Sequence, residues 1–314
     1  MSSVPDEKLA FSSVQRGFSP SARKPEIERR YLSVTDLKIH LLQSGLPYDS
    51  TQVLFLHGGS SDSAWLSWKH ALPAIGSMAL VVAPDLPGFG LSEKPDIYYS
   101  LDFYTRFVEE LIRKIDLIEP VVVGSSMGGW IALELILARR IHVRGLVLVD
   151  SAGYRPAIPF SWLARVLLPF PRLYFILRSW ISRYPFLIAH LMRFIVDPSA
   201  LKRDPELLRE VIEEMRRKHA GRAWNSFLRQ ELEKSRFRNS CESRLHELEI
   251  PVLLIHGRKD PLVPVEWAEE AHRKIPGSRL QVFEDCGHWP SREYPERFNS
   301  VLKEFLEELN SQLL

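Results

Sequence analysis

The sequence predicts an α/β fold in which a mostly parallel sheet is flanked by helices. Short continuous apolar runs recur along the chain, and runs of this length suit strands that are buried on both faces of a parallel sheet. They occupy residues 53–56, 79–83, 120–123, 145–149, 251–255 and 279–283. Helical patterns alternate with these runs, at residues 101–115, 127–138, 265–274 and 295–309. Because strand and helix follow one another in this way, we expect a doubly wound sheet with helices on both faces.

The chain before these runs divides into an arm and a hairpin. Residues 1–26 are rich in Ser, Pro and Arg and lack periodicity, so we expect a flexible N-terminal arm. Residues 27–33 and 37–43 alternate in polarity, which predicts a hairpin of two strands. The chain begins without the apolar segment of a secretory signal, and it contains no apolar stretch of about 18 residues. We therefore expect a cytoplasmic protein.

One segment interrupts the alternation after the sixth strand. Residues 151–240 contain no convincing strand and are rich in Trp, Phe, Leu and Arg, which predicts a helical insert. Residues 27–150 and 241–314 would then form the core. The charged stretch Glu206–Lys218, within the insert, is expected to be a solvated helix.

The first half of the insert is its most apolar part. Residues 162–196 are dense in aliphatic and aromatic side chains that are interrupted by arginines. We expect an amphipathic helix pair that lines a lipophilic pocket, with Trp162 among the lining residues, while the arginines keep their charged ends in water. Transient contact with a membrane surface is the alternative, because basic amphipathic helices also bind there.

Composition excludes some classes of function. The chain has 314 residues and a formal net charge of only +2, which gives no basis for nucleic-acid binding. Its two cysteines, Cys241 and Cys286, lack a metal-binding spacing, so we expect free thiols in a reducing compartment and no metal site.

The strongest chemical signal is the segment Gly124-Ser125-Ser126-Met127-Gly128. It matches G-x-S-x-G directly after the apolar run at 120–123 and directly before a helical pattern, which is the context that a nucleophile elbow requires. A tight turn between small residues would expose the hydroxyl of Ser126, and the following helix N-terminus favours developing negative charge. Ser125 is the rival serine, but it occupies the x position.

A serine nucleophile needs a base and an acid that orients the base. His288 follows the last predicted strand, in a turn that Gly287 and Pro290 delimit. Asp260 follows the strand at 251–255, and loops after strand ends are where sites assemble in open α/β sheets. We therefore predict His288 as the base and Asp260 as the acid, with Asp150 as the alternative acid.

An oxyanion hole is predicted from His57-Gly58-Gly59, which follows the strand at 53–56. Glycine lets the backbone approach a substrate closely. The two donors would be the backbone N–H groups of Gly59 and Met127, while His57 is expected to hold the loop.

Together these segments resemble the α/β-hydrolase fold superfamily from about residue 27 to the end. The motifs that carry the resemblance, in chain order, are His57-Gly58-Gly59, Asp85-Leu86-Pro87-Gly88-Phe89-Gly90-Leu91-Ser92, Gly124-Ser125-Ser126-Met127-Gly128-Gly129, Gly257-Arg258-Lys259-Asp260 and Gly287-His288-Trp289. The resemblance implies an eight-stranded core, a catalytic triad that needs no cofactor, and a helical cap inserted after strand 6.

Two kinds of enzyme within this superfamily fit the motifs. The Ser-Met-Gly-Gly and Gly-His-Trp segments look like those of meta-cleavage C–C hydrolases, in which Trp289 would flank the substrate and a cap arginine, near Arg209, would bind its acid group. However, Ser60-Ser61-Asp62 stands where those enzymes continue a glycine run. We therefore favour a carboxylesterase or lipase that acts on a small ester or lipid-like substrate. The second alternative is a non-catalytic, ligand-binding member of the fold.

Overall fold

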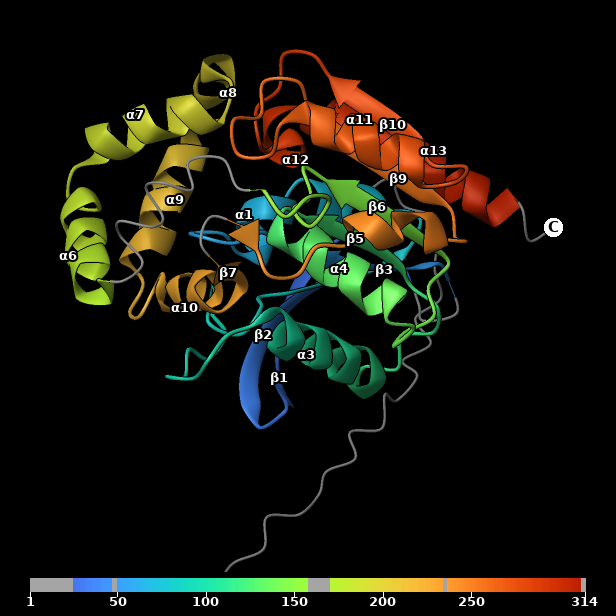
Figure 1. The fold of residues 1–314 in the computed structure, drawn as a ribbon, viewed down its shortest axis with the longest axis horizontal. Helices are drawn as coiled ribbons and strands as arrows, with labels where there is room; N and C mark the ends of the chain where they lie inside the picture. Colours follow the sequence, from blue (N-terminus) through green and yellow to red (C-terminus); the bar gives the residue numbers. More distant parts are fainter. Residues whose placement is uncertain (1–24, 47–49, 158–169, 234–235, 312–314) are drawn as a thin grey trace, which may run out of the picture.

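The computed structural model describes residues 25–46, 50–157, 170–233 and 236–311, so that most of the predicted arm and Trp162 lie outside the described residues. Eight strands form one sheet in the order β1-β2-β4-β3-β5-β6-β9-β10 (Figure 1). Strand β2 runs antiparallel to both of its neighbours, and every other pairing in this sheet is parallel. The strands are β1 (Ile27–Val34), β2 (Leu37–Gly45), β3 (Gln52–Leu56), β4 (Leu80–Pro84), β5 (Val121–Ser125), β6 (Gly145–Val149), β9 (Val252–Gly257) and β10 (Arg279–Phe283). The predicted fold class and strand positions are confirmed.

Helices cover both faces of the sheet, which explains why the central strands are apolar without alternation. In β3, Leu54 and Leu56 pack into one core cluster, whereas Val53 and Phe55 pack into the cluster on the other face. The first cluster includes side chains of α3 (Leu101–Lys114), α4 (Met127–Leu137) and α11 (Val265–Lys274). The second includes side chains of α1 (Ala64–Trp68), α2 (Ala71–Gly76) and α13 (Pro295–Ser311).

The insert contributes a group of helices beside the sheet. They are α6 (Pro171–Ile181), α7 (Pro185–Ile195), α8 (Pro198–Arg203), α9 (Pro205–Arg216) and α10 (Arg222–Glu231). Each of the first four begins with a proline in its first turn, where a missing N–H costs no hydrogen bond. In Figure 1, α6 and α7 form the outer edge of the molecule, and α10 lies nearer to the core.

Two expectations for the insert are wrong. Helix α9 is not solvated all round, because Leu207, Glu210 and Val211 are buried where it packs against α7 and α1. The insert also contains a hairpin of two-residue strands, β7 (Leu232–Glu233) and β8 (Arg236–Phe237), which are too short to leave a pattern in the sequence.

Two smaller findings concern the described part of the chain as a whole. None of its helices combines the length and the apolar character needed to cross a bilayer. Cys241 and Cys286 are buried and form no disulfide, as predicted.

Two short elements belong to the C-terminal part of the core. They are the 3-10 helix η1 (Glu242–Glu247) and the helix α12 (Pro290–Glu293).

Candidate active site

Ser126 occupies a strained turn between β5 and α4. Its φ of 49° and ψ of −113° lie in a region that few residues other than glycine adopt, and such strain is typical of active sites. A Cβ on Gly128 would lie 2.3 Å from the carbonyl oxygen of Leu56, so only glycine lets α4 pack this close to the sheet. The N–H of Ser126 donates to the oxygen of Val149 at 2.9 Å, and the oxygen of Ser126 accepts from Ala152 at 3.1 Å. Both backbone groups of Ser126, its N–H and its C=O, are therefore hydrogen-bonded to residues at or just after the end of β6.

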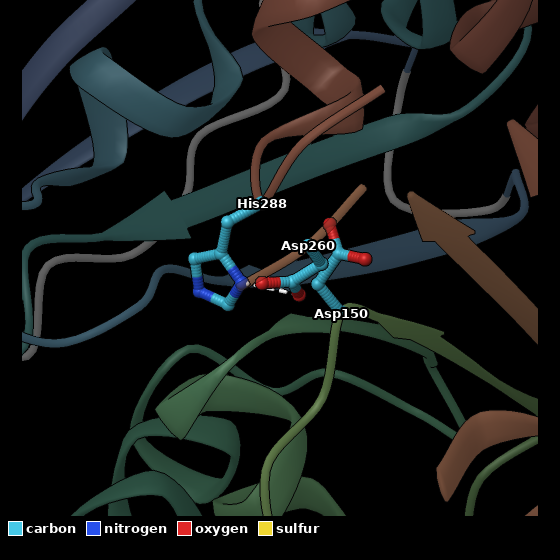
Figure 2. A group of neighbouring side chains, drawn as sticks. All are labelled: Asp150, Asp260 and His288. Atoms are coloured by element: carbon cyan, nitrogen blue, oxygen red, sulfur yellow. Dashed lines mark hydrogen bonds and ion pairs between the residues drawn. The ribbon is translucent and has the colours of Figure 1, made fainter. Parts of the chain in front are cut away.

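His288 and Asp260 come together from the loops after β10 and β9. The Nδ1–H of His288 donates to Oδ2 of Asp260 at 2.6 Å (Figure 2). The other carboxylate oxygen, Oδ1, accepts from the backbone N–H groups of Leu262 at 2.7 Å and Val263 at 3.0 Å. These three hydrogen bonds fix the carboxylate, and the bond to His288 leaves the imidazole Nε2 as the nitrogen that can accept a proton.

The charge of Asp260 changes the basicity of His288. Burial by itself disfavours the imidazolium, but the attraction of Asp260 and its hydrogen bond outweigh burial and raise the pKa of His288 above 6.5. A histidine with a raised pKa is a stronger base once it is deprotonated, which suits a group that must take a proton from a serine hydroxyl.

Asp150, the alternative acid, lies beside this pair but does not bind His288. It ends β6, is fully buried, and accepts from the N–H of Gly257 at 2.8 Å through Oδ1. Its Oδ2 has no hydrogen-bond partner among the described residues. Burial and the nearby charge of Asp260 raise the pKa of Asp150 well above its usual range. The two aspartates lie side by side in Figure 2, but only Asp260 is hydrogen-bonded to His288.

His256 supports the same cluster, although the sequence reasoning gave it no role. Its Nε2–H donates to the oxygen of Val263 at 2.8 Å and lies 3.5 Å from Asp150 and 3.6 Å from Asp260. Burial lowers the pKa of His256, so it is neutral and bridges the loop that carries Asp260. A histidine at the end of a buried strand, four residues before the predicted acid, was the available signal.

The predicted oxyanion donors belong to segments that adjoin Ser126 or its cavity. Gly59 borders the same cavity as Ser126, and Met127 follows Ser126 at the N-terminus of α4. Within the described residues, neither backbone N–H donates a hydrogen bond. His57 holds this loop as expected: its Nδ1–H donates to Gly58 at 2.7 Å, and its Nε2 accepts from the N–H of Leu86 at 3.0 Å.

Asp62, in the segment that departs from the glycine-run pattern, shapes the same loop. Its carboxylate accepts from the backbone of Gly58 at 2.7 Å and from the hydroxyl of Ser67 at 2.6 Å. Burial raises the pKa of Asp62, which borders the cavity. This buried carboxylate thus ties Gly58 to α1.

A cavity of about 250 Å³ lies over Ser126 and His288, and its lining is mainly apolar. The predicted residue Trp289 borders it and donates from Nε1 to Ser67 at 3.2 Å. Trp224, on α10, was missed by the sequence reasoning; its ring lies so close to Gly59 that a Cβ there would come within 2.3 Å. The other apolar lining residues are Ile188, Leu191, Met192, Ile195, Val211, Met215 and Leu262.

The cationic side chain at this cavity is not the expected one. Arg209 is largely exposed on α9, faces Glu206 and Glu213, and does not border the cavity. Arg178, on α6, does border it and donates from Nη2 to Ser61 at 3.0 Å. The expectation for Arg209 is therefore wrong, because sequence spacing did not reveal which insert helix faces the site.

The loop that carries His288 is tied to the insert. The backbone N–H of His288 donates to the oxygen of Ile195 at 2.9 Å, at the end of α7. The buried carboxylate of Glu293 accepts from Gly287 at 3.0 Å, from Trp289 at 2.9 Å and, within the insert, from Asp197 at 2.7 Å. A displacement of the C-terminal end of α7 would therefore also move His288.

Comparisons with known proteins show which family the chain belongs to. The model of the alpha/beta hydrolase family matches residues 53–301. The 2-hydroxymuconate semialdehyde hydrolase of Pseudomonas sp. (strain CF600) is 28% identical over 295 residues, which cover 91% of this chain and 96% of that protein. Two solved structures are each 26% identical. A bacterial membrane phospholipase A has a TM-score of 0.72, with 90% of this chain and 87% of that chain covered. The 2-hydroxy-6-oxo-6-phenylhexa-2,4-dienoate hydrolase from Rhodococcus has a TM-score of 0.73, with 90% and 99% covered.

Proposed function

We propose that this chain, which belongs to the alpha/beta hydrolase family, is a serine hydrolase that cleaves a carboxylic ester through an acyl-enzyme intermediate. One observation supports this above the others: Ser126, in its strained turn, faces the same cavity as a His288 that is hydrogen-bonded to Asp260. This is the arrangement of nucleophile, base and orienting acid that acyl transfer requires.

In the proposed reaction, Nε2 of His288 takes the proton of Ser126 as the hydroxyl oxygen attacks the ester carbonyl. The N–H groups of Gly59 and Met127 would stabilise the oxyanion, and removal of one such donor typically costs about 3 kcal/mol. His288 then gives the proton to the leaving alcohol, which leaves the acyl group on Ser126. Water attacks this acyl group with His288 again as base, which releases the acid and restores the serine.

The cavity favours an apolar acyl group of modest size. Its lining is aliphatic and aromatic, so burial of an acyl chain there is favoured by roughly 0.8 kcal/mol per methylene. The volume of about 250 Å³ is just below the range of ordinary ligand pockets, roughly 300–1,000 Å³. We therefore expect short acyl chains or a single ring to be preferred among soluble substrates.

Hydrolysis of a carbon–carbon bond in an acidic dienone is the second candidate. Similarity to the semialdehyde hydrolase of Pseudomonas and to the dienoate hydrolase of Rhodococcus favours it. In addition, Arg178 at the cavity provides a cation that could bind the carboxylate of such a substrate. The same serine, histidine and aspartate would serve, with a carbanion rather than an alkoxide as the leaving group.

The test measures turnover of a p-nitrophenyl ester series of increasing chain length by the wild type, Ser126→Ala and Ser125→Ala. We expect a maximum at short chains, a loss on the order of 10⁵ to 10⁶ in kcat for Ser126→Ala, and retained turnover in Ser125→Ala. Circular dichroism checks that each variant is folded.

A parallel assay follows the disappearance of a meta-cleavage dienone. Ser126-dependent decay of the dienone without ester turnover would replace the ester proposal by the second candidate. Absence of Ser126-dependent turnover in both assays would contradict both and leave a ligand-binding member of the family.

A further inference from the structure

The outer side of α6 presents a stripe of large apolar side chains to solvent. Leu173, Ile176, Leu177 and Trp180 are 42%, 64%, 37% and 49% exposed. Their spacing of i, i+3, i+4 and i+7 places them on one face of the helix. An amphipathic helix normally turns such a stripe toward the core, whereas this stripe remains uncovered among the described residues.

Helix α7 continues this surface and connects it to the active-site cavity. Phe186 and Leu191 are 68% and 48% exposed, whereas Ile188 and Met192 are buried on the other side. The helix is thus apolar on both sides, which suits apolar surroundings on both sides. Leu191 also borders the cavity above Ser126, so this surface and the cavity meet at one side chain.

Charge on this segment has a single sign. Residues 151–196 contain six arginines, no lysine and no Asp or Glu. Arg172, Arg183 and Arg193 are exposed, and none of them forms an ion pair within the described residues. Several exposed arginines of the core do have carboxylate partners: Arg113 pairs with Glu110, and Arg258 with Glu284. Arg172, Arg183 and Arg193 are therefore available to bind anionic groups of another molecule.

A cationic hollow adjoins α6. It has a volume of about 780 Å³ and no acidic side chain in its lining. Its basic lining residues come from α6, α9 and α10 and from the segments that follow α6 and α9. Among the described residues, Arg217 pairs with Glu214 at 2.7 Å and Arg222 lies 3.9 Å from Asp96. The basic lining residues are Arg178, Arg183, Arg216, Arg217, His219 and Arg222. Phosphate groups are the natural counterpart of such a set of guanidinium donors.

We propose that the outer face of the insert, defined by Leu173, Ile176, Leu177, Trp180, Phe186 and Leu191, binds the surface of an anionic phospholipid bilayer. The apolar side chains enter the boundary between headgroups and acyl chains, and the arginines contact lipid phosphates. A second copy of the chain fits less well, because a symmetric contact would bring arginines of this face against one another without a carboxylate between them.

Bilayer binding would place the substrate next to the cavity, a consequence that rests on the proposed function. Leu191 would then stand at the boundary between lipid and cavity, and an acyl ester could reach Ser126 without crossing water.

The test is vesicle co-sedimentation of the full chain with phosphatidylcholine vesicles, with and without roughly one third phosphatidylglycerol. We expect binding to the anionic vesicles, weakening at high salt, and at least a tenfold weaker affinity for Ile176→Ser/Phe186→Ser and for Arg172→Gln/Arg183→Gln/Arg193→Gln. The matched controls are Tyr98→Ser/Ile118→Ser, at residues that are 81% and 70% exposed elsewhere, and Arg106→Gln/Arg113→Gln. Both controls should bind like the wild type.

Several outcomes would overturn the proposal. They are the absence of binding to anionic vesicles, equal binding to neutral vesicles, and equal loss in variants and controls. A concentration-dependent dimer in sedimentation velocity that Ile176→Ser/Phe186→Ser abolishes would assign the face to a second copy instead. Turnover of a soluble ester should be unchanged in Ile176→Ser/Phe186→Ser, since neither residue borders the cavity. If the wild type does not hydrolyse esters, the proposed function fails, but vesicle binding still tests this proposal independently.

Discussion

At the scale of single residues, two aspartates approach one histidine and differ in their hydrogen bonds. Asp260 accepts from two backbone donors and from His288. Asp150 has one backbone donor and does not bind His288, and burial together with the charge of Asp260 raises its pKa well above the usual range. Replacing Asp260 should therefore affect catalysis far more than replacing Asp150.

Amide substitutions separate these roles. We expect Asp260→Asn to lower kcat by about 10⁴, because the histidine loses its orienting acceptor. Asp150→Asn should stay within about tenfold of the wild type, because Asp150 does not bind His288 and the amide oxygen can still accept from Gly257. The measurement is ester turnover across a pH range. Equal losses in the two variants would contradict the assignment of Asp260 as the orienting acid.

The same pH series tests His288. Activity requires its neutral form, so kcat/KM should rise with pH to a plateau, with an apparent pKa above 6.5 that reflects the attraction of Asp260. In Asp260→Asn this apparent pKa should fall, because the attraction is gone. A pH profile that Asp260→Asn leaves in place would show that another group controls it.

At the scale of elements, Arg292 on α12 joins the core to the insert. It is buried, and it donates to the oxygen of Leu66 on α1 at 2.6 Å, to Asp204 at 2.6 Å and to Glu210 at 2.8 Å. Asp204 is also the N-cap of α9, where it accepts from Leu207 at 3.2 Å. One side chain thus fixes the start of α9, which borders the active-site cavity through Val211 and Met215.

Arg292→Leu should destabilise the fold by about 3–5 kcal/mol, because it removes the buried guanidinium that binds Leu66, Asp204 and Glu210 together. Arg297→Leu, at an exposed arginine five positions further along the chain, is the matched control and should cost less than about 1 kcal/mol. Urea unfolding followed by circular dichroism measures both. Similar costs for the two variants would mean that Arg292 does not hold the elements together.

The pH dependence of this cluster has a definite sign. Burial raises the pKa of Asp204, but the interactions with His70 and Arg292 outweigh burial and lower this pKa. Burial likewise raises the pKa of Glu210, and the charge of Arg292 is the main cause that lowers it below its usual value. Groups with a lowered folded-state pKa stabilise the fold above their unfolded pKa, and this contribution is lost as pH falls through the folded value. The wild type should therefore lose stability in acid, and Arg292→Leu should lose less.

At the scale of the whole molecule, features that leave a local sequence pattern could be predicted, whereas features that depend on packing between distant segments could not. Strand positions were correct because burial on both faces leaves continuous apolar runs. His288 binds Asp260 and borders one cavity with Ser126 because each of the three follows a strand of the same sheet. Trp224 and Arg178 were missed because their approach to the cavity depends on how α10 and α6 pack, which no local pattern records. The buried side of α9 was hidden for the same reason.

The two cysteines report on both core layers. Cys241 belongs to the cluster on the α3 and α4 side, and Cys286 to the cluster on the α13 side. Burial raises the pKa of both thiols, so neither should react with a thiol reagent in the native state. If the molecule unfolds as one unit, both should become reactive at the same urea concentration, as measured by mass spectrometry of the labelled peptides. Separate midpoints would show that the two layers unfold independently.

The contact between α7 and Gly287 also bears on protein engineering. A Cβ on Gly287 would lie 2.3 Å from the oxygen of Ile195, the same oxygen that accepts from His288. Grafting the insert of a relative onto this core therefore carries a condition that no sequence alignment displays. The grafted insert must place a backbone carbonyl where that of Ile195 lies, against Gly287. Without this carbonyl, the graft could supply a new substrate pocket but would leave His288 without the hydrogen bond that positions it.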